Sequence, residues 1–473
     1  MPGVVVLVFV QSMSDSASKI TLVHLSDIHF IKASAVGPDV LDEDIRRELK
    51  RDVVALCGTL GNAHGILVTG DIAYSGKIEE YKRAEEWLLE LCRETKCSEQ
   101  NVWMICGNHD VQRDVITSSV SLRDFQSKLR TQEISKIDAI YQEYLTDSAA
   151  RTIVYSALQN YNDFAQKFGG HFAHDRIFWE KDIVLNDGSK LRIRGLNSAI
   201  GCNRDDNKDT GHLLTVGSAN CAVPRLEAHE YMTLCHHPPD WLRDSDEVAR
   251  FLNSRVRIQL FGHKHRRRIE PGDESGFAFL KLHAGAVNPG QGETSLPRYN
   301  VLALHVSTSA PSEKKRTLHI EIHPRIWDPD QTKFITESAA CDPGGTSKTF
   351  SLSLDWLEKA SQPELASTPQ LSEVTSQPQV NNPFNIPTPA EPAPKVMNGS
   401  WKLSFRFLSL PFHKRMEVAN ELHLLEDSDS QIDHAELFRR LFRRAAERNE
   451  LREFYNAVEK KHTGNLPDDN PFT

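Results

Sequence analysis

The stretch that decides the fold is MICGNHDV, which runs from Met104 to Val111. An apolar run of strand type at 102–106 stops there at Gly107. Three polar side chains follow with no spacer: Asn108, His109 and Asp110. A strand that ends in a glycine and three metal- or proton-binding side chains indicates that the chain has reached a functional site at the edge of a sheet.

The residues on either side of this stretch alternate between two patterns. Apolar strands are predicted at 21–25, 65–69 and 102–106, with helical periodicity over 44–57 and 78–92 between them. Strand, helix, strand, helix, strand is typical of a layered α/β fold. Further strands are predicted at 178–184, 191–196, 230–235, 256–261, 277–284, 299–306 and 318–323. Residues 113–170 are mostly helical and polar, and we interpret them as an insertion that borders the pocket or forms an oligomer contact.

Composition limits the class of protein. The chain has 473 residues, enough for two or three domains, and a net charge of −9. No global positive field would attract nucleic acid, so a nucleic-acid substrate would need a local basic patch. Eight cysteines occur without a CxxC pair, which favours reduced thiols in a cytoplasmic protein.

Four segments flank or follow the predicted catalytic domain at 20–360. Residues 1–19 contain an apolar run at 4–10 that is too short to span a bilayer, and we interpret them as a flexible segment or as residues ahead of a start at Met13. Eight of the 23 prolines fall between 361 and 396, which indicates an extended linker over 361–397. Helical periodicity returns in a small all-α bundle at 398–464, followed by a tail at 465–473.

Five predicted strands end in carboxylate, amide or imidazole side chains, which are Asp27, His29, Asp71, Asn108, His236, His237, His263 and His265. Ligand sites in layered α/β folds collect at the carboxyl ends of strands, so we expect these side chains to share one rim. Asp27 and His29 would face one side if that stretch stays extended. The carboxylate of Asp71 has two oxygens and can bridge two ions about 3.5–4 Å apart.

The donor set indicates the kind of metal. Mixed oxygen and nitrogen donors suit manganese, iron, zinc or similar ions and are poor ligands for calcium. Gly70, Gly107 and Gly262 let the backbone turn sharply and come close to the ions. A lone Gly-Asp or Asp-x-His is more often a turn than a ligand pair. Five such pieces, each placed directly after a strand, together predict a metal centre.

The motif order D-x-H, G-D, G-N-H-D, H and G-H-x-H resembles the calcineurin-like metallophosphoesterases over residues 20–324. The segments HLSDIHF, GDIAYSG, HHPP and GHKH are most similar to the branch that includes bacterial cyclic-nucleotide phosphodiesterases. The resemblance implies a four-layer αββα sandwich around two divalent metal ions. One metal would take Asp27, His29, Asp71 and His265, and the other Asp71, Asn108, His236 and His263. The family's ligand stands two residues before a proline, which favours His236 over His237.

The same resemblance assigns a catalytic role to His109, near the leaving group. A protonated imidazole there can act as general acid and stabilise charge on the phosphate. Asp110 either orients His109 or caps a turn. The nucleophile would be a metal-bound hydroxide, since metal binding lowers the pKa of water.

The predicted reaction is metal-assisted hydrolysis of a phosphodiester or phosphomonoester. A nucleotide phosphodiesterase, a nuclease of a bacterial conflict system and a non-catalytic scaffold of the same fold are the alternatives. Overall acidity favours small substrates, and the complete ligand set argues against the scaffold. Arg266, Arg267 and Arg268 either hold a second phosphate or form a solvated charge run. No membrane partner is expected.

The helical bundle at 398–464 does not belong to the catalytic family. Asp433 and Glu436 form a predicted capping box, and four arginines form either a basic edge or a solvated helix face, namely Arg439, Arg440, Arg443 and Arg444. The bundle distantly resembles the effector-associated or death-like helical adaptors of bacterial conflict-system proteins. On this interpretation it recruits the enzyme to a protein partner.

Overall fold

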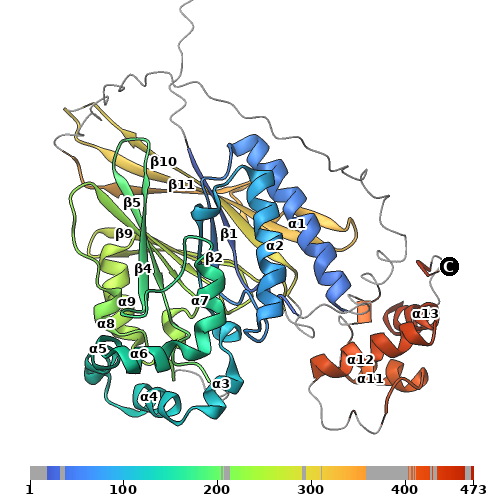
Figure 1. The fold of residues 1–473 in the computed structure, drawn as a ribbon. Coiled ribbons are helices and arrows are strands. Elements are labelled where there is room, and N and C mark those ends of the chain that lie inside the picture. Colours follow the sequence, from blue (N-terminus) through green and yellow to red (C-terminus); the bar gives the residue numbers. More distant parts are fainter. Residues whose placement is uncertain are drawn as a thin grey trace, which may run out of the picture.

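The structure is a computed structural model (Figure 1), and it describes residues 19–31, 38–203, 206, 213–289, 295–310 and 312–357, and in the C-terminal part 403, 406–407, 410, 412–426, 429, 434–463 and 470–472. The predicted N-terminal segment up to residue 18 and the predicted linker at 361–397 lie outside the described residues. So do the side chains of the predicted capping box.

A seven-stranded sheet contains β1, the strand that ends two residues before Asp27. Its order is β12-β11-β10-β1-β2-β3, and β13 pairs with β11. Neighbours β1, β2 and β3 run parallel, whereas β10 runs antiparallel to β1. All six residues of β1 are buried, as expected of a strand that is covered on both faces. The strands span Ile20–Leu25 (β1), Gly65–Thr69 (β2), Val102–Ile105 (β3), Arg298–Thr308 (β10), Arg316–Asp328 (β11), Lys333–Thr336 (β12) and Lys348–Leu354 (β13).

A six-stranded sheet packs against the first one. Its order is β4-β5-β6-β7-β9-β8, with β5, β6, β7 and β9 parallel. The predicted hairpin is confirmed, because β4 and β5 pair antiparallel from Phe178↔Leu196 to Val184↔Lys190. The strands span Phe178–Val184 (β4), Lys190–Leu196 (β5), His229–Cys235 (β6), Ile258–Phe261 (β7), Arg268–Glu274 (β8) and Phe277–His283 (β9).

Helices cover the outer faces of the two sheets. The helices α1 (Pro38–Leu60) and α2 (Ile78–Thr95) lie beside the first sheet, and α8 (Ser218–Cys221) and α9 (Ser245–Arg255) beside the second (Figure 1). Between the sheets, β2 and β3 contact β5 and β6. The layers therefore follow the predicted order helix, sheet, sheet, helix, around one continuous hydrophobic core.

The segment between β3 and β4 is helical. Most of its helices gather at one end of the sheets, whereas the last of them runs alongside the sheets (Figure 1). They are α3 (Arg113–Ser118), α4 (Val120–Thr131), α5 (Ile137–Thr146), α6 (Ser148–Tyr155) and α7 (Gln159–Ala165). Because α3 begins three residues after Asp110, this segment starts directly at the predicted site.

The C-terminal helices have a hydrophobic core of their own. They are α11 (Phe412–Glu421), α12 (His434–Glu447) and α13 (Leu451–Thr463), and Phe407, Phe438 and Phe454 are among the buried residues that hold them together. Across the described part of the chain, none of the helices is both long and apolar enough to cross a membrane.

Candidate metal centre

The strand ends of both sheets meet at one place. The backbone N–H of Asp27 donates to the carbonyl oxygen of Gly70 at 3.0 Å, and that of His29 to the carbonyl of Asp71 at 3.0 Å. These bonds join the loops after β1 and β2. In the second sheet, the N–H of Gly262 donates to the carbonyl of His236 at 3.1 Å and joins the loops after β6 and β7. The hydrogen-bonded loops bring residues far apart in sequence to a common rim.

All seven predicted metal ligands lie in this cluster. The ligand atoms of Asp27, His29 and His265 lie within 4.8 Å of one another, and so do those of Asp27, Asp71 and His236. The Nε2 atom of His236 lies 3.3 Å from Oδ2 of Asp71.

The remaining two predicted ligands, Asn108 and His263, join the same cluster. Oδ1 of Asn108 lies 3.2 Å from Nε2 of His236 and 3.1 Å from Nδ1 of His263. Together with the two groups above, these contacts place two overlapping sets of donors side by side.

The backbone at the site departs from the expected extended form. Asp27 and His29 have φ values of 51° and 53°, so the stretch is not extended, yet the ligand atoms of the two residues still lie within 4.8 Å of each other. Asp71, His263 and His265 also lie in the left-handed region, with φ values of 53°, 68° and 53°. Such conformations cost on the order of 1–3 kcal/mol each in non-glycine residues and collect at functional sites. The surrounding hydrogen bonds hold these five residues in sharp turns that direct their side chains to one place.

Glycines form the wall behind the ligands. A Cβ atom on Gly107 would lie 2.2 Å from Oδ1 of Asp71 and 2.7 Å from Nε2 of His236. A Cβ on Gly262 would lie 2.3 Å from Oγ of Ser26 and 2.9 Å from Nδ1 of His236. Any side chain at these positions would occupy the space that the ligands use, so the predicted close approach of the backbone is present.

Electrostatics keep two of the imidazoles and both carboxylates in the protonation states that bind metal ions, whereas the charge of Asp71 outweighs burial and raises the pKa of His236 to about 9, so this imidazole must lose a proton to bind an ion. Burial lowers the pKa of His29 and of His263 to about 3, so both imidazoles are neutral at pH 7. Burial alone would raise the pKa of Asp27, but the hydrogen bond and the charge of His265 outweigh it and lower this pKa to about 2. Likewise, His236 outweighs burial and holds the pKa of Asp71 well below its usual value.

The residues present fit a metal ion. Nδ1 of His29 is buried and has no hydrogen-bond partner among the residues that the structure describes. Such an orphaned buried atom is costly unless a ligand satisfies it. Neutral imidazoles, ionised carboxylates and an amide oxygen are the donors that transition-metal ions prefer.

His109 and Asp110 do not form the pair that was one of the two interpretations. The Nδ1 atom of His109 lies 2.8 Å from the carbonyl oxygen of Tyr74.

The carboxylate of Asp110 instead accepts hydrogen bonds from the N–H groups of Gly107 and Ala73, both at 2.9 Å. It also accepts from Tyr81 Oη at 2.9 Å and from the N–H of Ile72 at 3.2 Å. Asp110 therefore fixes the backbone of two ligand loops, which matches the capping interpretation.

His237 and His236 have different surroundings. Nδ1 of His237 lies 2.8 Å from Oγ of Ser198, and burial holds the pKa of His237 well below its usual value. Nδ1 of His236 instead contacts the carbonyl oxygen of Thr69 at 2.7 Å, which leaves Nε2 toward Asp71 and Asn108. His237 also forms a candidate group with His236 and His263, so the choice of His236 as the ligand stays a prediction.

The arginine run after His265 divides in two. Arg267 is buried: it pairs with Glu337 and donates to the carbonyl oxygens of Tyr299 at 2.5 Å and of Arg325 at 2.8 Å. Arg266 and Arg268 are exposed. Arg267 thus joins the two sheets, and neither interpretation of the run, a phosphate clamp or a solvated face, describes it.

No sequence pattern indicates several of the groups that support the site. The carbonyl oxygens of Thr69 and Tyr74 orient His236 and His109, but every residue type offers a carbonyl. The ring of Trp241 lies edge-on to that of His263, with 4.4 Å between the centroids. The segment HHPPDW places Trp241 five residues after the predicted ligand His236, and this spacing is the sequence signal that could have identified it.

Comparison with known proteins supports the metallophosphoesterase class that the fold and the site indicate. A model of the calcineurin-like phosphoesterase family matches residues 20–267. This span is just over half of the chain, and the chain belongs to that family. Members of this family are metal-dependent phosphoester hydrolases. A model of the GTPase-associated adaptor domain matches residues 401–460, which include the C-terminal helices.

Two known proteins are similar to the chain. The uncharacterized metallophosphoesterase-like protein YydB of Bacillus subtilis strain 168 is 22% identical over 282 residues, which cover 57% of this chain and 54% of YydB. The chain thus spans about half the length of this curated relative. The solved structure of the sulfate thiohydrolase SoxB of Thermus thermophilus with glycerol has a TM-score of 0.28 and 10% identity, covering 60% of this chain and 54% of SoxB.

Proposed function

We propose that the protein hydrolyses phosphodiesters of nucleotide type at a centre of two divalent metal ions. The observation that carries the proposal is the position of Asp71. Its Oδ2 lies 3.3 Å from Nε2 of His236, and it shares one cluster with Asp27. His29 also lies within 4.8 Å of it. A carboxylate placed between two donor sets is what a pair of adjacent cations requires.

The chain offers ligands for both ions. Asp27, His29 and His265 would hold one ion and Asn108, His236 and His263 the other, with Asp71 shared between them. When bound, two such ions would polarise the phosphate and lower the pKa of a water molecule toward neutrality. The mixed set of oxygen and nitrogen donors suits manganese, iron, zinc or a similar metal.

His109 is placed to handle the proton of the leaving group. A carbonyl oxygen only accepts, so Nδ1 of His109 carries a proton toward Tyr74 and Nε2 is the nitrogen that can exchange one. The doubly protonated ring would donate from Nε2 to the departing alkoxide. The N–H of His109 also donates to Oδ1 of Asp71 at 2.8 Å, which ties the acid to the metal cradle.

Small substrates are favoured over nucleic acid. A nuclease reading would draw on the basic run after His265, but Arg267 is buried in contacts with Glu337 and two carbonyl oxygens. Lys264 pairs with Asp240. Of this run only Arg266 and Arg268 are exposed to a nucleic-acid backbone, on a chain with a net charge of −9. All eight cysteines are free thiols, which supports a cytoplasmic location.

The adaptor domain supports recruitment to a protein partner. Arg440 and Arg444 do not form an open basic edge, because both pair with Asp429. Arg443 is exposed. We therefore propose that the partner is recognised by the shape of the bundle rather than by a row of arginines.

A substrate screen tests the catalytic part. The full chain with added manganese is assayed on 2′,3′- and 3′,5′-cyclic nucleotides, single-stranded DNA, RNA and phosphomonoesters, with metal content measured in parallel. We expect Asp71→Ala to lose bound metal and turnover. His109→Ala should keep its metal and lose at least about a hundredfold in turnover of esters with poor leaving groups.

The control is His319→Ala, a histidine on β11 that contacts Ser307 and Ser351. It should behave as wild type in both measurements. Turnover by Asp71→Ala at the wild-type rate would refute the metal mechanism, and faster hydrolysis of DNA than of every nucleotide would refute the substrate class.

A further inference from the structure

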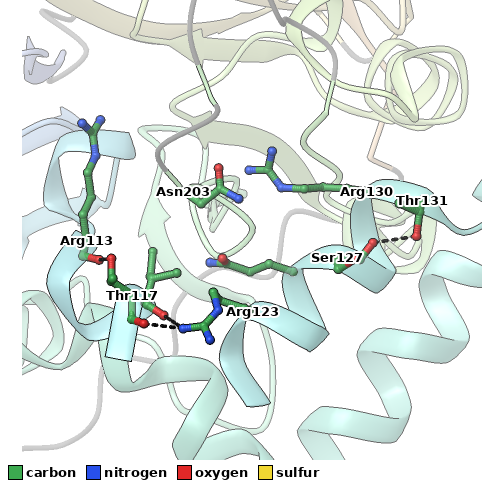
Figure 2. Close-up of a pocket in the computed structure, with 9 residues that line it drawn as sticks. Arg113, Thr117, Arg123, Ser127, Arg130, Thr131 and Asn203 are labelled. Atoms are coloured by element: carbon green, nitrogen blue, oxygen red, sulfur yellow. Dashed lines mark hydrogen bonds between the residues drawn. The ribbon is translucent and has the colours of Figure 1, made fainter. Parts of the chain in front are cut away.

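Ser26, which lies between β1 and Asp27, donates a hydrogen bond to a carboxylate. Hydroxyl groups in helices commonly donate to the carbonyl oxygen four residues earlier, as Thr131 of α4 does to Ser127 at 2.8 Å (Figure 2). Oγ of Ser26 instead donates to Oδ2 of Asp27 at 2.5 Å, and both residues are fully buried. The hydroxyl of Ser26 therefore contacts one of the predicted metal ligands directly.

The proton of this hydroxyl goes to the carboxylate rather than to the backbone. A hydroxyl carries only one proton, so it donates to one acceptor at a time. Oγ of Ser26 lies 2.5 Å from Oδ2 of Asp27 but 3.3 Å from the carbonyl oxygen of Thr69. An O–H group that donates to an ionised oxygen lies about 2.5–2.7 Å from it, so the shorter contact is the charge-assisted hydrogen bond.

The two carboxylate oxygens of Asp27 have different surroundings. Oδ2 accepts from Oγ of Ser26 and also from the N–H of His263 at 3.2 Å. Oδ1 is buried, lies 3.3 Å from Nε2 of His265 and has no hydrogen-bond partner in the part of the chain that the structure describes. A buried ionised oxygen without a donor is costly unless a cation satisfies it. The hydrogen bonds on Oδ2 therefore leave Oδ1 as the oxygen for a metal ion.

Segments from both sheets fix the position of Ser26. Its carbonyl oxygen accepts from the N–H of Val287 at 2.9 Å, and the carbonyl oxygen of Asp27 accepts from the N–H of Asn288 at 3.0 Å, both in the segment after β9. A Cβ atom on Gly262, in the loop after β7, would lie 2.3 Å from Oγ of Ser26. The hydroxyl thus occupies space that a glycine leaves open, and the fold rather than free rotation of the side chain sets its position.

We propose that Ser26 is a positioning residue of the metal centre, whose hydroxyl holds Oδ2 of Asp27 so that Oδ1 alone binds the ion. The inference rests on the proposed function and deepens it, because it assigns how one ligand is presented. A carboxylate that binds through one oxygen leaves a position on the ion that a carboxylate bound through both oxygens would fill, and substrate or water can take that position. Groups that orient a ligand from behind typically contribute about 10–100-fold to metal affinity.

Titration of the metal-free full chain with manganese, followed by calorimetry, tests the proposal. We expect Ser26→Ala to bind manganese about 10–100-fold more weakly than wild type. Ser189→Ala is the matched control, because Ser189 is equally buried and its Oγ donates to Oδ1 of Asp187 at 2.6 Å, in the turn between β4 and β5. This control removes the same kind of hydrogen bond away from the predicted ligands and should bind manganese as wild type does.

A double-mutant cycle separates positioning from a merely structural role. If Ser26 acts through Asp27, the loss of its hydroxyl should change manganese affinity by less than about twofold in an Asp27→Ala background. A structural role would instead weaken binding by the same factor in both backgrounds.

The visible spectrum of bound cobalt(II) gives a second readout that needs no Asp27 variant. Its absorption should weaken in Ser26→Ala and not in Ser189→Ala, because a carboxylate that binds through both oxygens raises the coordination number of the ion.

The outcomes distinguish this inference from the proposed function. Wild-type manganese affinity and an unchanged cobalt spectrum in Ser26→Ala would overturn the role of Ser26 and leave the proposed function standing. Equal losses of affinity with and without Asp27 would also overturn it. A wild-type chain that binds manganese but cleaves no phosphoester would refute the proposed function, while the role of Ser26 would still be decided by the affinities. A wild-type chain that binds no manganese or cobalt would refute both.

Discussion

Replacement of Gly107 by alanine should disable the site while leaving the fold intact. The new Cβ would lie 2.2 Å from Oδ1 of Asp71, whereas ordinary contact begins near 3.4 Å. Asp71 would have to move by about 1 Å, and a misplacement of this size costs roughly a hundredfold in rate, or about 2.7 kcal/mol in the barrier. His236 is disturbed as well, because its Nε2 would lie 2.7 Å from the same atom.

The assay is kcat/KM on bis-p-nitrophenyl phosphate with manganese, together with bound metal after dialysis. Gly58→Ala is the matched control, since a Cβ there meets nothing within 4 Å and Gly58 lies inside α1. We expect this control to keep full activity and to gain about 0.5–1 kcal/mol in stability. If Gly107→Ala retained its metal and stayed within twofold of wild-type activity, the close packing of glycine against the ligands would not be what shapes the site.

Two further predictions concern the supporting structure. Tyr81→Phe removes the 2.9 Å hydrogen bond to Asp110 and should lower the free energy of unfolding by about 2 kcal/mol, measured by urea unfolding of the full chain. Arg444→Gln leaves the buried carboxylate of Asp429 with a weaker partner and should destabilise the C-terminal helices by about 3 kcal/mol, measured by hydrogen exchange over residues 412–463.

Each of these variants has a control of the same chemistry. Tyr231→Phe removes a buried hydroxyl that has no hydrogen-bond partner among the described residues, so it should cost less than about 0.5 kcal/mol. Arg443→Gln changes an exposed neighbour of Arg444 and should leave exchange rates unchanged. Equal effects of Tyr81→Phe and Tyr231→Phe would show that the Tyr81 hydrogen bond does not support the ligand loops.

The sequence predicted the catalytic fold and the members of the ligand cluster, because both depend on local signals. Apolar runs identify buried strands, and a polar side chain directly after a strand lies at the sheet edge whatever the rest of the chain does. Asp27, Asp71 and His263 were found in this way. Their role as metal ligands stays a prediction that the variants above test.

The interpretations that did not hold depend on partners distant in sequence. Arg267 was read from its neighbours as an anion contact or a solvated charge, but Glu337, seventy residues later, pairs with it inside the protein. The sequence suggests Asp110 as a possible partner of the adjacent His109. In the structure its carboxylate instead accepts hydrogen bonds from the N–H of Ala73 and from Oη of Tyr81. No local pattern carries such contacts, and the left-handed turn at Asp27 is likewise imposed by the loop after β2.

The place of β1 in the first sheet has a consequence for biosynthesis. The first predicted ligands follow this strand, yet one of its two neighbours is β10, whose residues 300–304 pair with residues 20–24. A ribosome therefore releases Asp27 and His29 about 270 residues before β10, the strand that pairs with the open edge of β1. A fragment that stops at residue 267, where the family match ends, would contain every ligand and still leave β1 with an open edge. We therefore expect metal binding during translation to follow the synthesis of β10, which contains none of the predicted ligands.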